Sequence, residues 1–238
     1  EFRLLTDAVG EKGYRQIDIN LGCPFPMIAG KHKGAGMLLY PAQVAEVLAP
    51  IAEYPEIQFS LKMRLGWENA SECMVLVELL NTLRLSRIAL HARTGKQQYK
   101  GHPDLEAFQG FYELCQHPLY YNGGIESLSD IRQILIRFPL LKGVFIGRGL
   151  LSSPLLAKEF KGNETFLPEQ RMSIYFAFHE ELFSAYSQVL QGETQLLVKM
   201  KTLWEYFLPE TDRKLLKRIK KSTRLQQYTE SVKAIFTS

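Results

Sequence analysis

The sequence predicts an α/β fold in which a parallel β-sheet with helical crossovers is followed by a helical bundle. Two patterns carry this prediction. Between residues 15 and 160, short β-rich runs alternate with longer segments of helical periodicity, which is typical of a parallel sheet. From residue 163 onward the strand pattern stops and helical periodicity continues. We therefore expect a β/α domain over residues 1–162 and a helical domain over residues 163–238.

The individual elements follow from the same patterns. A helix is expected first, over residues 2–12. Strands are expected in the runs 15–22, 57–66, 87–94, 118–124 and 142–149. Helices are expected between them at 42–53, 70–84, 104–116 and 127–138, and beyond them at 168–190, 193–208, 209–221 and 224–236. Pro168 and Pro209 suit the first positions of helices, and Gly192 suits a break between two of them.

Length and composition exclude several classes of protein. The chain has 238 residues, of which 46% are hydrophobic, enough for one large domain or for a domain with a smaller one. The longest apolar runs, such as CMVLVELL, are too short to span a membrane, and residues 1–12 lack the pattern of a signal peptide. The three cysteines are widely spaced and show no metal-ligand spacing. A cytoplasmic protein without a metal site or a membrane segment is expected.

Positive charge is concentrated near the end of the chain. Residues 195–238 contain ten lysines and arginines but only four acids, although the whole chain has a net charge of only +4. A basic region on a near-neutral body is typical of a protein with a polyanionic partner. A solvated helix face explains the same cluster about equally well.

Polar and reactive side chains gather where the predicted strands end. They are Asn20, Cys23, Lys62, Arg64, His91, Arg93, Asn122 and Arg148. Barrels of eight β/α units and open doubly wound sheets both bind ligands at this edge, so the placement alone does not choose between them. Because strand residues alternate between faces, Lys62 shares a face with Arg64, and His91 shares one with Arg93. Several of these groups could converge on one ligand.

Two glycine turns are candidate phosphate sites. Asn122-Gly123-Gly124 and Gly147-Arg148-Gly149 each follow a predicted strand, and backbone N–H groups at such turns bind anions. A plain tight turn is the rival interpretation of each motif. Two successive turns of this kind favour a phosphate-bearing cofactor. The sequence has neither G-x-G-x-x-G nor a P-loop, which argues against a dinucleotide-binding Rossmann domain and a nucleoside triphosphatase.

Three side chains have more than one chemical interpretation. Lys62, in a mostly apolar strand, could form a Schiff base, could hold the electron-rich edge of a flavin, or could reach water from the strand end. His91 could contact a ligand or be a satisfied core histidine. Cys23 lies in a turn between Gly22 and Pro24, without a local histidine base. A nucleophile and a proton donor therefore both remain open for this thiol.

Taken together, these stretches resemble the tRNA-dihydrouridine synthase family. The matching segments are IDINLGCP, GKHKGAGMLL, SLKMRLGW, IALHARTGKQQYKG, YYNGGI and GVFIGRGLL. Their order and spacing are similar to that family's barrel from its fourth strand to its eighth. The resemblance implies a TIM-type (β/α)8 barrel that lacks its first three strands in this chain, followed by a helical tRNA-binding domain. An incomplete barrel is expected to close poorly and to hold its cofactor weakly.

The resemblance also implies an activity and roles for individual residues. The family's flavoproteins use FMN, reduced by NADPH, to reduce the C5=C6 bond of uridine in tRNA. On that mapping Cys23 gives the proton to C5, and reduced FMN gives the hydride to C6. Asn20 and Arg64 would bind the uracil edge, and Lys62 the isoalloxazine ring. The residues implied for the ribityl phosphate are His91, Asn122, Gly123, Gly124, Gly147 and Arg148, and those implied for tRNA are Lys199 and Lys201.

Three other functions remain as alternatives. A different FMN barrel oxidoreductase could act on a free pyrimidine, but a small substrate would not need the basic helical bundle. A Schiff-base aldolase could use Lys62 as its nucleophile. A non-catalytic fragment could bind tRNA without reducing it, consistent with the missing barrel strands. Flavin absorbance and dihydrouridine formation distinguish all three from the family's activity.

Overall fold

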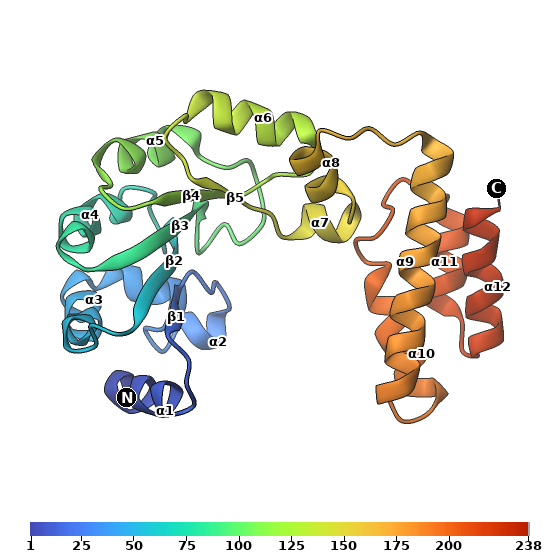
Figure 1. Ribbon diagram of the computed structural model, residues 1–238, viewed down its shortest axis with the longest axis horizontal. Coiled ribbons are helices and arrows are strands. Elements are labelled where there is room, and N and C mark those ends of the chain that lie inside the picture. Colours follow the sequence, from blue (N-terminus) through green and yellow to red (C-terminus); the bar gives the residue numbers. More distant parts are fainter. Residues whose placement is uncertain (238) are drawn as a thin grey trace. The chain divides into compact units, whose positions relative to one another are not determined.

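The computed structural model describes residues 1–237, and its chain divides into two compact units (Figure 1). The first unit contains Glu1–Ile125 and Ser129–Ile146. The second contains Glu126–Leu128 and the chain from Gly147 onward. The second unit therefore begins earlier than residue 163, where the sequence pattern placed the helical domain.

A parallel sheet forms the centre of the first unit. Its strands lie in chain order: β1 (Gln16–Leu21), β2 (Gln58–Gly66), β3 (Leu85–Thr94), β4 (Leu119–Asn122) and β5 (Gly143–Phe145). Every neighbouring pair is parallel. The connections contain α2 (Pro26–Ala29), η1 (Gly34–Leu39), α3 (Pro41–Leu48), η2 (Ala49–Glu53), α4 (Glu72–Thr82), α5 (Leu105–Leu114) and α6 (Leu128–Arg137). This confirms the predicted parallel sheet with helical crossovers.

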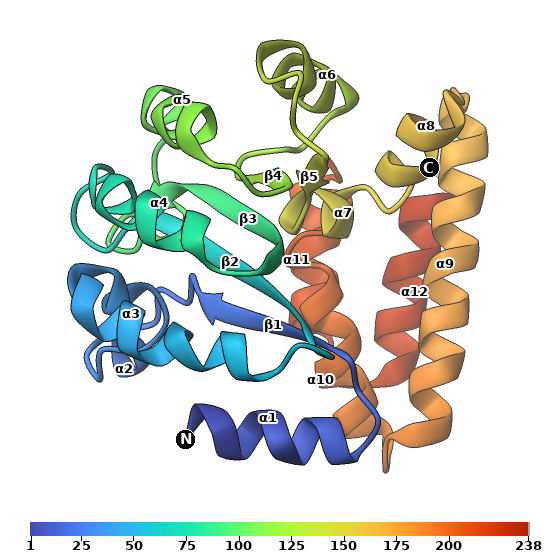
Figure 2. The same cartoon turned by 60° about the vertical axis from the view of Figure 1, so that its left-hand side comes forward.

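The two faces of the sheet differ in polarity. Helices α3 to α6 lie along one side of the strands, as Figure 2 shows. Alternate residues of β2, such as Phe59, Leu61 and Met63, are buried, as period-two alternation on a helix-covered face requires. The residues between them, Ser60 and Lys62, belong to the opposite, polar face. The polar side chains of the strands therefore lie together on the face that these helices do not cover.

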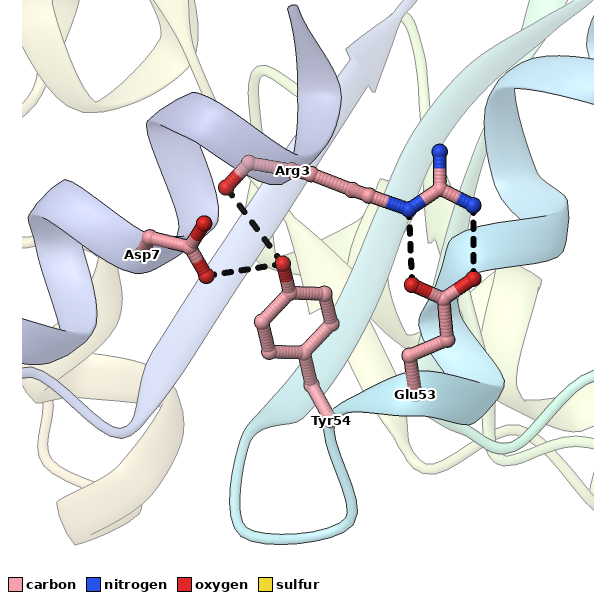
Figure 3. A network of polar contacts seen from close by, with 4 residues as sticks. All are labelled: Arg3, Asp7, Glu53 and Tyr54. Carbon is pink, nitrogen blue, oxygen red and sulfur yellow. Dashed lines mark hydrogen bonds and ion pairs between the residues drawn. The ribbon is translucent and has the colours of Figure 1, made fainter.

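Helix α1 (Phe2–Glu11) is joined to the end of η2 by exposed polar contacts (Figure 3). Arg3 Nε and Nη2 donate to the two carboxylate oxygens of Glu53, at 2.7 and 2.6 Å. The Tyr54 hydroxyl donates to Asp7 Oδ1 at 2.8 Å. Exposed ion pairs add little stability, so this network orients α1 more than it stabilises it.

Helices make up the second unit. They are α7 (Arg148–Ser152), α8 (Leu156–Gly162), α9 (Pro168–Val189), α10 (Glu193–Leu203), α11 (Arg213–Lys221) and α12 (Leu225–Phe236). Their core is built around Trp204, Phe207 and Tyr228, each at most 2% exposed. Leu155, between α7 and α8, is buried in the same core, and the hydroxyls of Ser153 and Tyr175 lie 2.7 Å apart. These contacts explain why the compact unit includes the segment before residue 163.

Two of the predicted helix starts agree with the structure, and one does not. Pro168 is the first residue of α9, and Gly192, at φ +83°, precedes α10, as predicted. Pro209 does not begin a helix. Instead, Asp212 caps α11, and its Oδ1 accepts from the backbone N–H of Lys214 at 2.8 Å and of Leu215 at 3.1 Å.

No helix within residues 1–237 is long and apolar enough to cross a membrane. The longest helix described above, α9, has 22 residues, but charged side chains interrupt its apolar positions. It packs instead in the core of the second unit through residues such as Tyr175.

A buried polar chain runs through the core of the second unit. Trp204 Nε1–H donates to the Tyr228 hydroxyl at 3.0 Å, and the Tyr228 oxygen lies 2.7 Å from His179 Nε2. Because tryptophan only donates, the Tyr228 hydroxyl proton is available for His179 Nε2. The other ring nitrogen, Nδ1, lies 3.0 Å from Glu180 Oε1 and donates to it. Burial lowers the pKa of His179, although Glu180 partly opposes this shift, so the folded state favours the neutral ring.

Acidification should weaken this unit through His179. Because the pKa of His179 is lower in the folded chain than the usual value of about 6.5, the unfolded state binds more protons as the pH falls. The free energy of unfolding of the full chain should fall by up to about 1.4 kcal/mol per pH unit below that value. Urea unfolding at pH 7, 6 and 5 measures this slope. His179→Gln is the control, and an unchanged slope in that variant would assign the dependence to another group.

Candidate active site at the carboxyl edge of the sheet

The Cys23 loop follows β1 and is held by local contacts. Asn20 Oδ1 accepts from the Gly22 N–H at 2.9 Å, and the Cys23 carbonyl accepts from the Ala35 N–H at 3.0 Å. Gly34 has φ +55°, and a Cβ there would lie 2.8 Å from the Cys23 carbonyl oxygen. Only glycine fits this close approach. The half-buried Cys23 thiol therefore stands on a rigidly positioned turn.

Arg64, on β2, ties this turn to the loop after β3. The side chain is only 2% exposed. Its Nε donates to the Gly22 carbonyl at 2.9 Å. Its Nη1 donates to the Thr94 carbonyl at 2.9 Å and to the Gln98 carbonyl at 2.7 Å. Burial lowers the pKa of this guanidinium, which nevertheless stays charged because arginine starts so far above neutrality. Three donors of this predicted substrate residue are thus engaged with the backbone.

Lys62 lies two residues before Arg64, and its Cα pairs with that of Asn20 on β1. Its side chain is half-buried, and no carboxylate within residues 1–237 lies in ion-pair distance of its ammonium group. Burial lowers the pKa of Lys62, repulsion from Arg64 lowers it further, and Asp18 raises it. The Asp18 carboxylate itself accepts from the Ser60 hydroxyl at 2.5 Å. An ammonium group in this setting suits an electron-rich ligand.

His91 and Arg93 are both 5% exposed and contact each other on β3. Arg93 Nη1 lies 3.2 Å from His91 Nε2, and Arg93 Nη2 donates to the Gly101 carbonyl at 2.9 Å. Since a guanidinium only donates, His91 Nε2 accepts and the ring proton is on Nδ1. His91 is thus oriented by the neighbouring Arg93 guanidinium. This burial fits both interpretations of His91, as a satisfied core histidine and as a residue that contacts a ligand.

One row of Cα positions links the predicted residues across the sheet. Arg64 pairs with His91, His91 with Asn122, and Asn122 with Phe145. Asn122 Nδ2 donates to the Phe145 carbonyl at 2.8 Å. The turn after Asn122 needs glycine at position 124, where φ is +62° and a Cβ would lie 2.9 Å from Pro103 Cγ. Gly123 lies against the His91 ring.

The remaining predicted residues belong to the second unit. Gly147 precedes α7, and the Arg148 carbonyl accepts from the Ser152 hydroxyl at 3.1 Å. Lys199 and Lys201 lie on α10. The Lys199 ammonium stands 5.4 Å from the centre of the Tyr186 ring, and the Lys201 ammonium donates to the Ser222 carbonyl. Their roles in binding phosphate or tRNA stay predictions.

Sequence reasoning missed the loop that follows β3. Gln98 supplies a carbonyl to Arg64, and the Tyr99 ring lies 5.5 Å from the Arg64 guanidinium carbon. The Tyr99 ring centroid is 6.4 Å from that of His91. The segment TGKQQYKG, already part of the family resemblance, was the available signal, but nothing in its composition showed that it returns to Arg64.

The sheet and the side chains at its carboxyl edge define a β/α domain with a candidate ligand site at the edge that parallel-sheet enzymes use. Within residues 1–237, no three histidine, cysteine or acidic side chains are grouped so that they could hold a metal ion. A comparison with protein families is more specific. The model described as "Dihydrouridine synthase (Dus)" matches residues 5–237, so the chain belongs to the dihydrouridine synthase family. The family predicted from the sequence motifs is confirmed.

Curated relatives carry names of the same family. The chain is 28% identical to tRNA-dihydrouridine synthase B of Vibrio vulnificus over 174 residues, which cover 70% of this chain and 54% of that protein. It is 32% identical to a probable tRNA-dihydrouridine synthase of Rhizobium leguminosarum over 139 residues, 58% of this chain and 44% of that protein. The chain thus spans about half the length of the curated relatives it matches.

A solved structure of morphinone reductase in complex with tetrahydroNAD is a distant likeness. It has a TM-score of 0.46 and 13% identity, and the match covers 71% of this chain and 50% of that one. A likeness at this level carries no argument about fold or function. The fold prediction is confirmed by the parallel sheet and the helical unit themselves.

Replacing Arg64 should destabilise the carboxyl edge. Arg64→Lys keeps the charge but cannot serve three carbonyls in two loops, because an ammonium group lacks the planar fork of a guanidinium. We expect a loss of about 2–4 kcal/mol in the free energy of unfolding, since buried bonds to a charged donor are lost. Urea unfolding of the full chain measures it. Arg87→Lys, at an exposed arginine of β3, is the matched control and should cost less than about 1 kcal/mol; equal losses in both variants would contradict the tethering role.

Proposed function

We propose that this chain carries the catalytic and tRNA-binding parts of a tRNA-dihydrouridine synthase, an oxidoreductase that reduces the C5=C6 bond of uridine in tRNA. Membership of the dihydrouridine synthase family supports the reaction class. The single observation that supports the chemistry most directly is the placement of the Cys23 turn beside the Arg64 guanidinium. A tRNA substrate would also be consistent with a cytoplasmic localisation of the protein.

The residues at the carboxyl edge suit FMN. Lys62 is a half-buried ammonium group with no carboxylate of residues 1–237 in ion-pair distance, which fits the electron-rich pyrimidine edge of a flavin. His91, Asn122, Gly123 and Gly124 would hold the ribityl phosphate, and the Gly147–Arg148 turn remains a phosphate contact predicted from the sequence. When bound, FMN would supply the hydride for uracil C6 and would be reduced again by NADPH.

Cys23 would give the second hydrogen of the product as a proton to uracil C5. A general acid needs placement over the reacting atom more than it needs a base beside it. The loop geometry restricts where the thiol can point, because Gly34 and the Ala35 N–H hold its backbone. The Arg64 guanidinium lies beside this turn, because its Nε donates to the Gly22 carbonyl at 2.9 Å. Water would then return a proton to the sulfur.

Asn20 would orient the uracil ring. Its Oδ1 already accepts from the Gly22 N–H, so its Nδ2 group is the part left to donate to a carbonyl oxygen of the base. Arg64 contributes mainly by holding the two loops, and its contact with the uracil edge remains a prediction from the family resemblance. A paired or stacked uridine must leave the tRNA helix to reach such a site, which requires backbone contacts elsewhere. Lys199 and Lys201 are predicted to supply part of these contacts.

Removing the thiol should stop the chemistry while leaving cofactor binding intact. Cys23→Ala is expected to retain FMN but to lower dihydrouridine formation at least 100-fold, in the range typical of a lost general acid. Dihydrouridine in tRNA, measured by mass spectrometry of nucleosides, reports the rate. Cys115→Ala, at another half-buried cysteine, is the matched control and should keep the activity. Unchanged turnover in Cys23→Ala would remove the acid role, and tRNA binding with no reduction by the unmodified chain would favour a non-catalytic fragment.

Replacing Lys62 should separate cofactor binding from stability. Lys62→Met removes an ammonium group that burial disfavours, so the cofactor-free chain should be as stable as before or slightly more stable. FMN affinity should fall by about tenfold or more, because the charged contact with the ring is lost. Flavin fluorescence titration and thermal unfolding measure the two effects. Tight FMN binding by the variant would contradict the assignment, and a lowered unfolding temperature would give Lys62 a structural role instead.

A further inference from the structure

One carboxylate shares the polar face of the sheet with Lys62. Asp18 lies on β1, and its Cα pairs with that of Ser60 on β2. Two positions further along both strands, Asn20 pairs with Lys62. We infer that Asp18 is a positioning residue, which holds the Lys62 ammonium group on this face where the ligand would bind. The inference rests on the proposed function, because that ligand would be FMN.

The Asp18 carboxylate is tied to the neighbouring strand. Its Oδ1 accepts from the Ser60 hydroxyl at 2.5 Å, and Ser60 is only 5% exposed. A bond between side chains at paired positions of neighbouring strands requires both to point to one face of the sheet. Ser60 and Lys62 share a face, because they are two residues apart on β2. Asp18 therefore lies on the same face as Lys62.

Asp18 is the one negative charge among the strands. Within residues 1–237, the five strands contain this single acid, against the bases Lys62, Arg64, Arg87 and Arg93. Neighbouring strands lie about 4.8 Å apart and rise about 3.3 Å per residue, which places the Cα atoms of Asp18 and Lys62 about 8 Å apart. Charges interact over such a distance on a partly buried face, where the effective dielectric constant is well below that of water.

The influences on Lys62 act in opposite directions. Burial lowers the pKa of Lys62 most, repulsion from Arg64 lowers it further, and Asp18 raises it. On β3, Lys62 pairs with Ala89, which carries no charge. The titratable and charged side chains on or next to this face are Asp18 on β1, Arg64 on β2, and Arg87 and His91 on β3. Asp18 is the member of this set that favours the charged form of Lys62.

An anion at this position serves the ligand without touching it. A partly buried ammonium group with no counter-charge is costly, so it turns to water or gives up its proton. Asp18 opposes both outcomes, because its carboxylate attracts the ammonium group and is itself fixed by Ser60. Lys62 can therefore remain a cation on the face that also carries Asn20, where an electron-rich ligand would meet it.

A double-mutant cycle tests the inference. Asp18→Asn removes the charge but keeps an oxygen that can accept from Ser60. It should lower the FMN affinity of the unmodified chain about three- to tenfold but that of Lys62→Met less than about twofold, because the effect is transmitted through Lys62. Flavin fluorescence titration measures the four affinities. Glu46→Gln removes an exposed carboxylate from α3 and is the matched control, with an expected change below about twofold.

The pH dependence of FMN affinity separates this role from a purely structural one. Because Asp18 raises the pKa of Lys62, the ammonium group should lose its proton at a lower pH in Asp18→Asn. The FMN affinity of this variant should therefore begin to decline at a lower pH than that of the unmodified chain, in titrations between pH 7 and 9.5. A loosened strand would instead weaken FMN binding equally at every pH, and such parallel curves would overturn the inference.

Equal losses of affinity in the unmodified chain and in Lys62→Met would also overturn it, as would no loss in either. Thermal unfolding of the cofactor-free chain gives an independent measurement. Asp18→Asn should lower the midpoint by about 2–4 °C in the unmodified chain and by less in Lys62→Met. If this coupling is present but no FMN binds, Asp18 still positions Lys62 and the proposed function fails. If FMN binds and dihydrouridine forms without the coupling, the proposed function stands and the positioning role fails.

Discussion

A buried guanidinium organises the carboxyl edge of the sheet. Arg64 is nearly inaccessible to water and is surrounded by the carbonyls of Gly22, Thr94 and Gln98. A cation in such a place is tolerated only when oriented dipoles replace its hydration. The same bonds connect the turn that carries Cys23 with the loop that carries Tyr99. The thiol and the surroundings of His91 are therefore positioned by one side chain that belongs to neither loop.

The division of the sheet into an apolar and a polar face makes this arrangement possible. Residues such as Leu61 and Met63 pack under the helices and supply the burial that stabilises the strands. The alternate positions, on the face that does not pack under these helices, are occupied near the carboxyl ends of the strands by Lys62, Arg64 and His91. Lys62 keeps an unfavourably desolvated charge there, a local cost that is typical of sites built to meet a ligand.

Periodic features of this protein could be predicted from the sequence, whereas contacts between distant residues could not. The alternation of β-rich runs with segments of helical periodicity predicted the parallel sheet and most helices, and the motifs predicted the family. The true start of α11 depends on one capping carboxylate, Asp212, which competes with the more conspicuous Pro209. The carbonyls that accept from Arg64 lie 30 or more positions away in the sequence. The Ser222 carbonyl that accepts from Lys201 lies 21 positions away. No local sequence pattern encodes contacts over such separations.

Helix α11 has an apolar side that packs in the core and a basic side that does not. Leu215, Leu216 and Ile219 anchor it in the core, and Asp212 caps its start, so its main tertiary contacts do not depend on its lysines and arginines. Mutations among those cations can therefore accumulate and be selected with little effect on stability. Substitutions of Arg64 are expected to be less well tolerated, because this side chain holds both the loop that contains Gly22 and the loop that contains Gln98. Evolutionary adjustment to new partners is thus far easier on the helical unit than at the sheet edge.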